Sequence, residues 1–156
     1  DRWGIQPSKL IVEITETSLL KDLDEAARTL EQLRQAGVTI CVDDFGVGYA
    51  SLRYLRELPV GLVKIDRSIV SGFGRIDSDT VIVTMLSRLA DVLDIQIVAE
   101  GIETEEQRER LTEIGCHFAQ GYLFAKGMPV EAFPLWLARW RRRHTHPSAW
   151  RAVVPG

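Results

Sequence analysis

Acidic side chains and one lysine lie at the ends of several short apolar runs in the sequence. Asp43 and Asp44 end one run, and Glu13, Lys64 and Glu100 lie near the ends of three others. Carboxylates gathered at one site repel each other and shift one another's pKa unless a cation lies between them. Oxygen ligands without histidine or cysteine suit Mg²⁺ or Mn²⁺ better than zinc. The pattern therefore predicts a Mg²⁺ or Mn²⁺ site.

The two adjacent aspartates favour two metal ions over one. At a strand end, where the chain turns, Asp43 can bridge two metals while Asp44 reaches only one. Two metals about 3.5–4 Å apart would hold the attacking and leaving oxygens of a phosphoryl displacement. Lys64 could orient the attacking water or neutralise charge on the phosphate. Gly46 and Gly48 would let the following loop move or approach a ligand closely.

Strand-like runs alternate with stretches of helical period, which is typical of an α/β fold. We expect strands at Leu10–Thr15, Thr39–Phe45, Leu62–Asp66, Ile95–Gly101 and His117–Phe124. All five are apolar on both faces, as in a parallel sheet covered by helices. The carboxyl ends of parallel strands meet at one edge, where the active sites of α/β proteins are built. The polar residues at these ends are therefore expected to converge.

Two of the expected helices carry capping signals. One starts at Asp22, with Glu25 three residues on, and stops at Gly37. The other starts at Thr104, with Gln107 at the spacing of a capping box.

Two further helices are indicated by apolar periodicity. A helix that begins near Asp77 or Ser78 is expected to turn inward Val81, Met85, Leu86, Leu89 and Leu93. The last helix, about Val130–Arg142, is expected to carry on one side Phe133, Trp136, Leu137 and Trp140. We interpret these aromatic residues as packing residues rather than a cofactor site.

The composition is that of one folded domain. The chain has 156 residues and a formal net charge of -3, which argues against a nucleic-acid polymer as partner. No apolar run reaches membrane-spanning length, so no membrane contact is expected from this segment. Cys41 and Cys116 lack the spacing of a zinc site and do not suggest a disulfide, so a reducing cytoplasm fits best.

Several of these residues also have a purely structural interpretation. Glu16, Asp66 and Glu103, each taken alone, could equally be helix N-caps or solvated charges. Lys64 could extend its ammonium from an apolar strand or simply pair with an acid. Acids at strand ends together with a lysine also suit proton abstraction in an enolase-like enzyme.

Five stretches resemble, in order, the signature motifs of the EAL domain family. They are EITET (13–17), DDFGVGYASL (43–52), KIDRSIV (64–70), AEGIET (99–104) and QGYLF (120–124). The resemblance implies a modified TIM barrel that hydrolyses cyclic di-GMP to the linear dinucleotide pGpG with Mg²⁺ or Mn²⁺. Its alternative is a catalytically inactive receptor that binds cyclic di-GMP and passes on a signal.

The resemblance also implies roles for individual residues. The metal ligands would be Glu13, Asp43, Asp44 and Glu100, and Lys64 would assist the water nucleophile. Gln120 and Gly121 would line the substrate site. The residues that couple the loop after Asp44 to a dimer interface would be Glu16, Phe45, Gly46, Gly48 and Glu103.

The sequence also departs from the family pattern. The segment with the E-A-L glutamate and the segment with a metal-binding asparagine are absent from this chain. We therefore expect residues 1–143 to form part of a barrel domain, followed by a tail at residues 144–156. A homodimer and upstream sensory or GGDEF domains are expected of the parent protein. Val47 and Ala50 replace a threonine and a serine that are usual in the loop.

Overall fold

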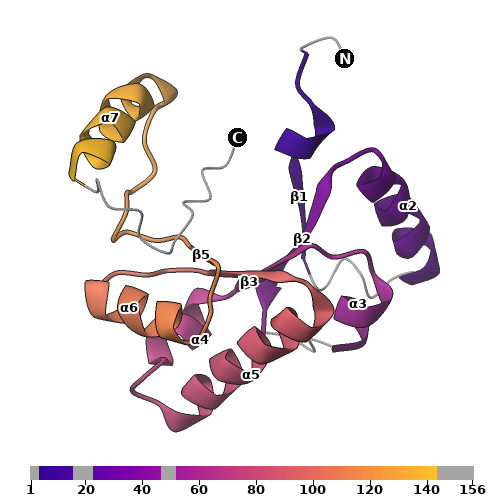
Figure 1. Ribbon diagram of the computed structural model, residues 1–156, viewed down its shortest axis with the longest axis horizontal. Coiled ribbons are helices and arrows are strands. Elements are labelled where there is room, and N and C mark those ends of the chain that lie inside the picture. The colour runs from indigo at the N-terminus through magenta and orange to yellow at the C-terminus, as the bar shows by residue number, and fades with distance from the viewer. Residues whose placement is uncertain (1–3, 16–22, 47–51, 144–156) are drawn as a thin grey trace.

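The computed structural model describes residues 4–15, 23–46 and 52–143. Its centre is a five-stranded parallel sheet whose strands lie side by side in sequence order (Figure 1). The strands are β1 (Ile11–Thr15), β2 (Thr39–Phe45), β3 (Leu62–Ile65), β4 (Gln96–Ala99) and β5 (Phe118–Ala119). Each lies within its predicted range. The α/β fold is confirmed, and the sheet formed by the described residues is open, as expected of an incomplete barrel.

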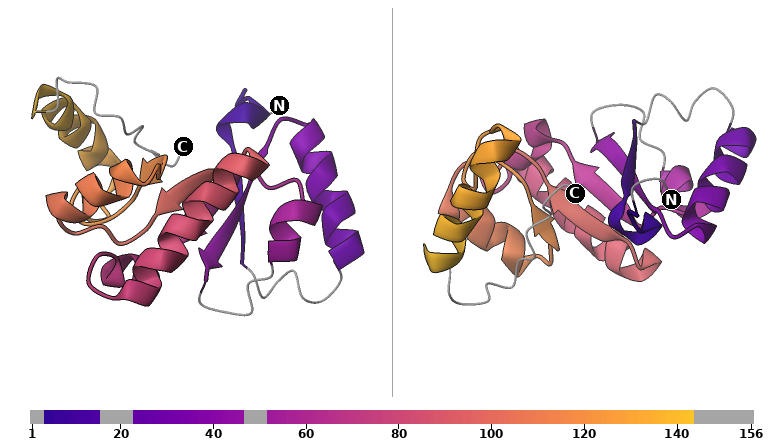
Figure 2. Two further views of the ribbon diagram at one scale, coloured as in Figure 1. Left: turned by 60° about the horizontal axis from the view of Figure 1, so that its bottom comes forward. Right: turned by 90° about the horizontal axis from the view of Figure 1, so that it is seen from above.

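Helices connect the strands. They are α2 (Leu23–Gln35), α3 (Leu52–Glu57), α4 (Arg67–Gly72), α5 (Asp77–Leu93), α6 (Glu105–Glu113) and α7 (Phe133–Arg143). Short 3₁₀ helices, η1 (Pro7–Lys9) and η2 (Val130–Ala132), precede β1 and α7. Helix α5 runs along the sheet (Figure 2), whereas α7 is separated from the other helices in the view of Figure 1. No helix in the described ranges combines the length and the apolar character needed to cross a bilayer.

The two faces of the sheet carry different residues because successive strand side chains point to opposite sides. One face joins the main core, in which Ile40, Val63 and Ile97 pack with helix residues such as Leu30 and Val83. The other face carries a smaller cluster of Cys41, Leu62, Val98 and Phe118. Two positions further along β2, β3 and β4, on this second face, come Asp43, Lys64 and Glu100. The alternation therefore places the chemistry on the face opposite the helices, one layer above an apolar layer.

The inward face of α5 differs from the prediction. Val81 and Met85 are 55% and 64% exposed, and the buried stripe contains Val83, Ser87 and Ala90. Leu86, Leu89 and Leu93 pack against the core as expected. The first two turns of α5 have apolar residues on both sides, so periodicity alone did not identify the side that the sheet covers.

Two short helices, α3 and α4, were not predicted. Each has six residues, too few for a helical period to show in the sequence. Asp66 caps α4, since its Oδ1 accepts a hydrogen bond from the Ser68 backbone N–H at 2.8 Å. The structural interpretation of Asp66 is therefore confirmed. The capping box of α6 is also present, with Thr104 at the N-cap and Gln107 reaching back to it.

Strand β5 is much shorter than predicted because the chain turns after Gln120. The Phe124 N–H donates to the Gly121 carbonyl at 3.1 Å, which closes a turn. At Gly121 the backbone passes so near Ile102 that an added Cβ would lie 2.2 Å from the Ile102 carbonyl oxygen. Only glycine allows this approach.

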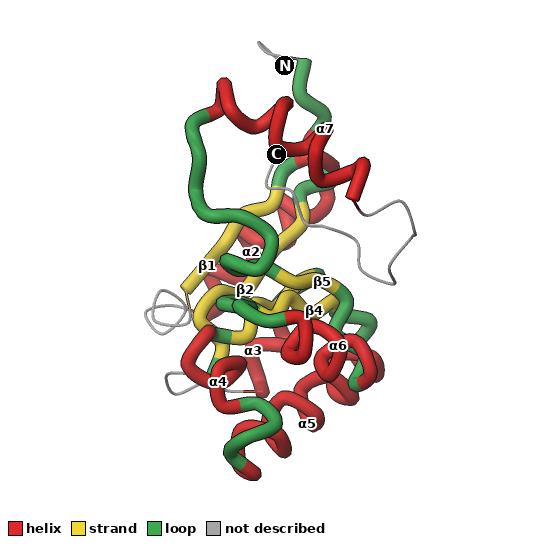
Figure 3. The backbone as a smooth tube through the Cα atoms, turned by 90° about the vertical axis from the view of Figure 1, so that its left-hand side faces the viewer, coloured by secondary structure: helices red, strands yellow, loops and turns green. Residues whose placement is uncertain are grey.

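The edge strand and the last helix are the least covered parts of the fold. Residues of β1 alternate between exposed and half-buried, although all four residues of β3 are buried. In α7, which Figure 3 shows apart from the sheet, Trp136 stacks on both Phe133 and Trp140 with ring centroids 5.7 Å apart. Trp140 in turn contacts Phe124. The aromatic residues of α7 thus pack on one another and on Phe124.

Candidate functional site

Lys64 lies at the centre of a group of carboxylates at the carboxyl ends of the strands. Its Nζ is 2.8 Å from Glu100 Oε1, 2.9 Å from Asp43 Oδ1 and 3.2 Å from Glu13 Oε2. The residue is only 7% exposed, so these carboxylates replace the water that would otherwise solvate the ammonium. We refer to Glu13, Asp43, Asp44, Lys64 and Glu100 as the acidic cluster.

A local irregularity of β2 brings both aspartates to this site. The pairing of β2 with β3 shifts register between Val42 and Phe45. Within that shift Asp44 has a φ of 55°, in the left-handed region, and its N–H donates to Asp43 Oδ1 at 3.1 Å. A bulge of this kind redirects a side chain that regular alternation would send to the other face. Consecutive aspartates therefore face the same site.

The charges in the acidic cluster do not balance. Burial raises the pKa of Glu100, and its contacts with Lys64 oppose this shift only in part. Burial lowers the pKa of Lys64, but hydrogen bonds to Glu100, Asp43 and Glu13 outweigh it, so the pKa lies above its ordinary value. The ammonium thus stays charged, and one positive charge faces several carboxylates. The site has the electrostatic character that attracts a further cation.

The donor set fits a hard divalent cation. Asp43, Asp44 and Glu100 each offer an oxygen, and these atoms lie within 4.8 Å of one another. Glu13 contacts Lys64 but is not part of this closest trio. Cys41 lies in the layer below, and burial raises the pKa of its thiol to about 12, so it is not a thiolate ligand at neutral pH. Three carboxylates without thiolate are the ligands that suit Mg²⁺ or Mn²⁺.

The remaining candidate residues are not among the side chains that form the acidic cluster. Gln120 is exposed at the end of β5, and the described residues show no hydrogen bond from its side chain to the cluster. Phe45 is the last residue of β2 and is buried, and Gly46 follows it with a φ of 101°. Glu16 and Gly48, as well as Val47 and Ala50, lie outside the described residues. Their predicted roles stay predictions.

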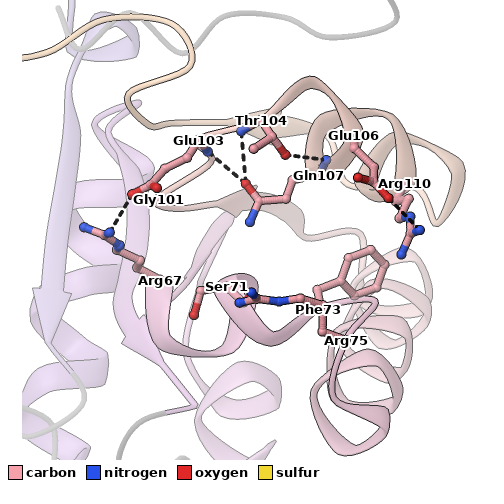
Figure 4. Close-up of a pocket in the computed structure, with 10 residues that line it drawn as sticks. All are labelled: Arg67, Ser71, Phe73, Arg75, Gly101, Glu103, Thr104, Glu106, Gln107 and Arg110. Atoms are coloured by element: carbon pink, nitrogen blue, oxygen red, sulfur yellow. Dashed lines mark hydrogen bonds and ion pairs between the residues drawn. The ribbon is translucent and has the colours of Figure 1, made fainter.

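The sequence reasoning missed one ion pair beside the acidic cluster. Arg67 Nη2 lies 2.5 Å from Glu103 Oε1, so Glu103 pairs with an arginine at the start of α4. A pocket of about 330 Å³ opens next to this pair, between α4 and α6 (Figure 4). The available signal was spacing, since Arg67 follows Lys64 by three residues and Glu103 follows Glu100 by three.

Comparison with known proteins identifies the family. Residues 1–127 match the EAL domain family. The bifunctional diguanylate cyclase/cyclic di-GMP phosphodiesterase MucR of Pseudomonas aeruginosa is 45% identical over 130 residues, which are 83% of this chain and 19% of MucR. The chain therefore spans about a fifth of that curated relative.

Solved structures have the same fold. A MucR phosphodiesterase in complex with c-di-GMP superposes with a TM-score of 0.79 and 44% identity, over 85% of this chain and 53% of that one. A manganese and cyclic di-GMP complex of BlrP1 from Klebsiella pneumoniae gives 0.74 and 33%, over 79% and 31%. With strand-end acids around a lysine, a matching fold and a family match over most of its length, this chain belongs to the EAL domain family.

Proposed function

We propose that the protein containing this chain is a metal-dependent phosphodiesterase that hydrolyses cyclic di-GMP to pGpG. The observation that carries the proposal is the acidic cluster, in which Lys64 contacts Glu13, Asp43 and Glu100 while Asp44 completes a trio of close oxygens. Relatives named as cyclic di-GMP phosphodiesterases, among them MucR and RocR of Pseudomonas aeruginosa, support the substrate.

Each part of the cluster suits a step of phosphodiester hydrolysis. Mg²⁺ or Mn²⁺, held by Asp43, Asp44 and Glu100 with Glu13 beside them, would lower the pKa of bound water and neutralise charge on the phosphate. Lys64 keeps its proton and so acts as a fixed donor, which can orient the attacking water or stabilise developing negative charge. The low exposure of Lys64 excludes competing solvent and strengthens these interactions.

The substrate would lie across the carboxyl edge of the sheet. Gln120 and Gly121 follow β5, which pairs with β4, the strand that leads to Glu100. We assign them to substrate contact, with Gln120 offering an amide. Coupling of the site, through the loop after β2, to a dimer interface is assigned to Glu16, Phe45, Gly46, Gly48 and Glu103.

The experiment is hydrolysis of cyclic di-GMP by the full-length protein with Mn²⁺, followed by chromatography of pGpG. Asp43→Ala and Lys64→Ala should each lower kcat by about 10³-fold or more, because they remove groups that act on the reacting atoms. Asp24→Ala, an exposed acid on α2, is the matched control and should leave kcat unchanged. Binding of cyclic di-GMP without hydrolysis by the unmodified protein would instead support the receptor function.

The assembly of the parent protein follows from the same assignment. We propose a homodimer with upstream sensory or cyclase domains, and a cytoplasmic location where the nucleotide is available. Exposed apolar residues on the outer side of α5, Val81, Met85 and Val92, offer a surface that a second copy could cover. Light scattering of the full-length protein tests this assembly, and a monomer at micromolar concentration would contradict it.

A further inference from the structure

We propose that Arg67 is a positioning residue for the acidic cluster, acting through Glu103 and Gly101 on the turn that carries Glu100. This inference rests on the proposed function and adds residues to its machinery. Two ion pairs of the same kind connect the β3 and β4 segments of the chain. Lys64, within β3, reaches Glu100, which follows β4, and Arg67 reaches Glu103 in the same direction three residues further on.

The turn after Glu100 changes its hydrogen-bonding partner at Gly101. The Glu100 N–H donates to the Ile65 carbonyl of β3 at 3.1 Å, whereas the Ile102 N–H donates to Gln120 on the β5 side at 3.1 Å. Glu100 is therefore the last residue that the backbone ladder holds to β3. Beyond it, the Arg67–Glu103 pair reconnects the turn to the β3 side.

The arginine also packs directly on this turn. An added Cβ at Gly101 would lie 2.2 Å from Arg67 Cγ and 2.7 Å from its Cβ and Cδ. The arginine stem thus lies across the backbone immediately after Glu100, and Gly101, with a φ of 69°, leaves the space for it. Arg67 holds the turn by contact along its stem and by charge at its end.

Both ends of the pair are anchored at helix starts. Arg67 is the first residue of α4, behind the Asp66 cap. The Glu103 N–H donates to Gln107 Oε1 at 2.9 Å, within the capping arrangement of α6 (Figure 4). Because both backbones are held, the ion pair fixes the distance between the two turns rather than joining two flexible side chains.

Because the Arg67–Glu103 pair is exposed, its effect on activity can be distinguished from its effect on folding stability. The Arg67 and Glu103 side chains are 59% and 48% exposed, and exposed ion pairs contribute little to folding. A small displacement of Glu100 would nevertheless matter, since a shift of about 1 Å can lower a rate by about 10²-fold. Loss of the pair should therefore reduce activity with little effect on stability.

The test measures kcat, KM, the dissociation constant for Mn²⁺ and the melting temperature of full-length Arg67→Ala, Glu103→Ala and the double variant. We expect kcat to fall about tenfold and Mn²⁺ binding to weaken several-fold in each single variant. KM should change less, and the melting temperature by no more than about 2 °C. The double variant should be no worse than Arg67→Ala, because Glu103 acts through Arg67. Arg67→Lys should restore part of kcat.

Matched controls come from the same pocket. Arg110 and Glu106 form an ion pair at 2.7 Å with side chains 46% and 72% exposed, whereas the three atoms nearest an added Cβ at Gly101 all belong to Arg67. Glu106→Ala should leave kcat and Mn²⁺ affinity unchanged. Equal losses in Glu106→Ala and Glu103→Ala, or unchanged kcat and Mn²⁺ affinity in Arg67→Ala, would overturn the inference.

Failure of the proposed function would look different. If the unmodified full-length protein did not hydrolyse cyclic di-GMP, the function would be wrong while the Mn²⁺ dissociation constants would still decide the role of Arg67. Weaker Mn²⁺ binding in Glu103→Ala than in Glu106→Ala would support it, and equal binding would refute it.

Discussion

The inner strands and the edge strand contribute to one site under very different conditions. Lys64 lies in β3 and Glu100 directly follows β4, and both strands are paired on both sides; the two side chains are 9% and 16% exposed. Glu13 belongs to β1, which is paired only with β2 in the described residues, and its side chain is 49% exposed. The ion pair between Lys64 and Glu100 is therefore buried, whereas the Glu13 partner of Lys64 is half exposed to solvent. We expect substitutions on the inner strands to lower stability and activity more than substitutions on the edge strand.

The largest effect is expected at Lys64, which pairs with both the buried Glu100 and the exposed Glu13. Lys64→Met should lower kcat for cyclic di-GMP by at least about 10³-fold, because it removes the fixed donor while keeping an apolar stem of similar length. It should also destabilise the metal-free protein by about 3 kcal/mol, since the carboxylates lose their cation. Denaturant unfolding with and without Mn²⁺ measures this, and equal stability of both proteins without metal would contradict it.

One isoleucine on an inner strand and one on the edge strand test whether burial makes the inner strands more important for stability. Ile97 on β4 is 1% exposed and Ile11 on β1 is 42% exposed. Ile97→Ala should lower the free energy of unfolding by about 2–4 kcal/mol, through lost burial and a cavity. Ile11→Ala should cost less than about 1 kcal/mol. Urea denaturation of the two variants measures both free energies of unfolding. Similar losses in the two variants would mean that β1 is covered in the intact protein.

A smaller difference is expected in metal binding. Glu100→Gln should weaken Mn²⁺ binding by about 10–100-fold, because Glu100 belongs to the close trio of oxygens. Glu13→Gln should weaken it less, since Glu13 contacts Lys64 outside that trio. Titration with Mn²⁺ by electron paramagnetic resonance gives both constants. A greater loss for Glu13→Gln would place Glu13 closer to the metal than the present geometry does.

The smallest effect concerns the thiol below the cluster. Burial raises the pKa of Cys41 to about 12 and likewise that of Cys116, so at pH 8 the thiolate fraction of each is far lower than in a free cysteine. Alkylation by iodoacetamide should be slow at pH 8 in the folded protein and should rise with pH. The same protein in urea is the control. Rapid labelling of Cys41 without urea would show that the inner strands open readily.

Much of the fold was predictable because its signals are local. The β-branched runs around Ile40 and Val63 identified strands, and the Thr104–Gln107 capping box identified the start of α6. Parallel pairing then implied that Asp43, Lys64 and Glu100 would approach each other, and they do. Such inferences succeed where a few neighbouring residues determine the backbone.

Other features depended on contacts between distant segments. The side of α5 that faces the sheet was misassigned at Val81 and Met85, because apolar residues occur on both sides. The short helices α3 and α4 carry too few residues for a period, and β5 ends early because Gly121 lies against Ile102. None of these contacts leaves a pattern in the local sequence.

The sequence by itself determined the α/β class, the strand positions, the family and the set of acidic residues, because residue type and spacing along a strand specify these. Only the tertiary structure decided that Lys64 contacts three carboxylates, that Asp44 turns toward them, and that Arg67 reaches Glu103. The reason is physical. Side-chain distances across strands depend on register, bulges and packing, which arise from the whole sheet rather than from any one segment.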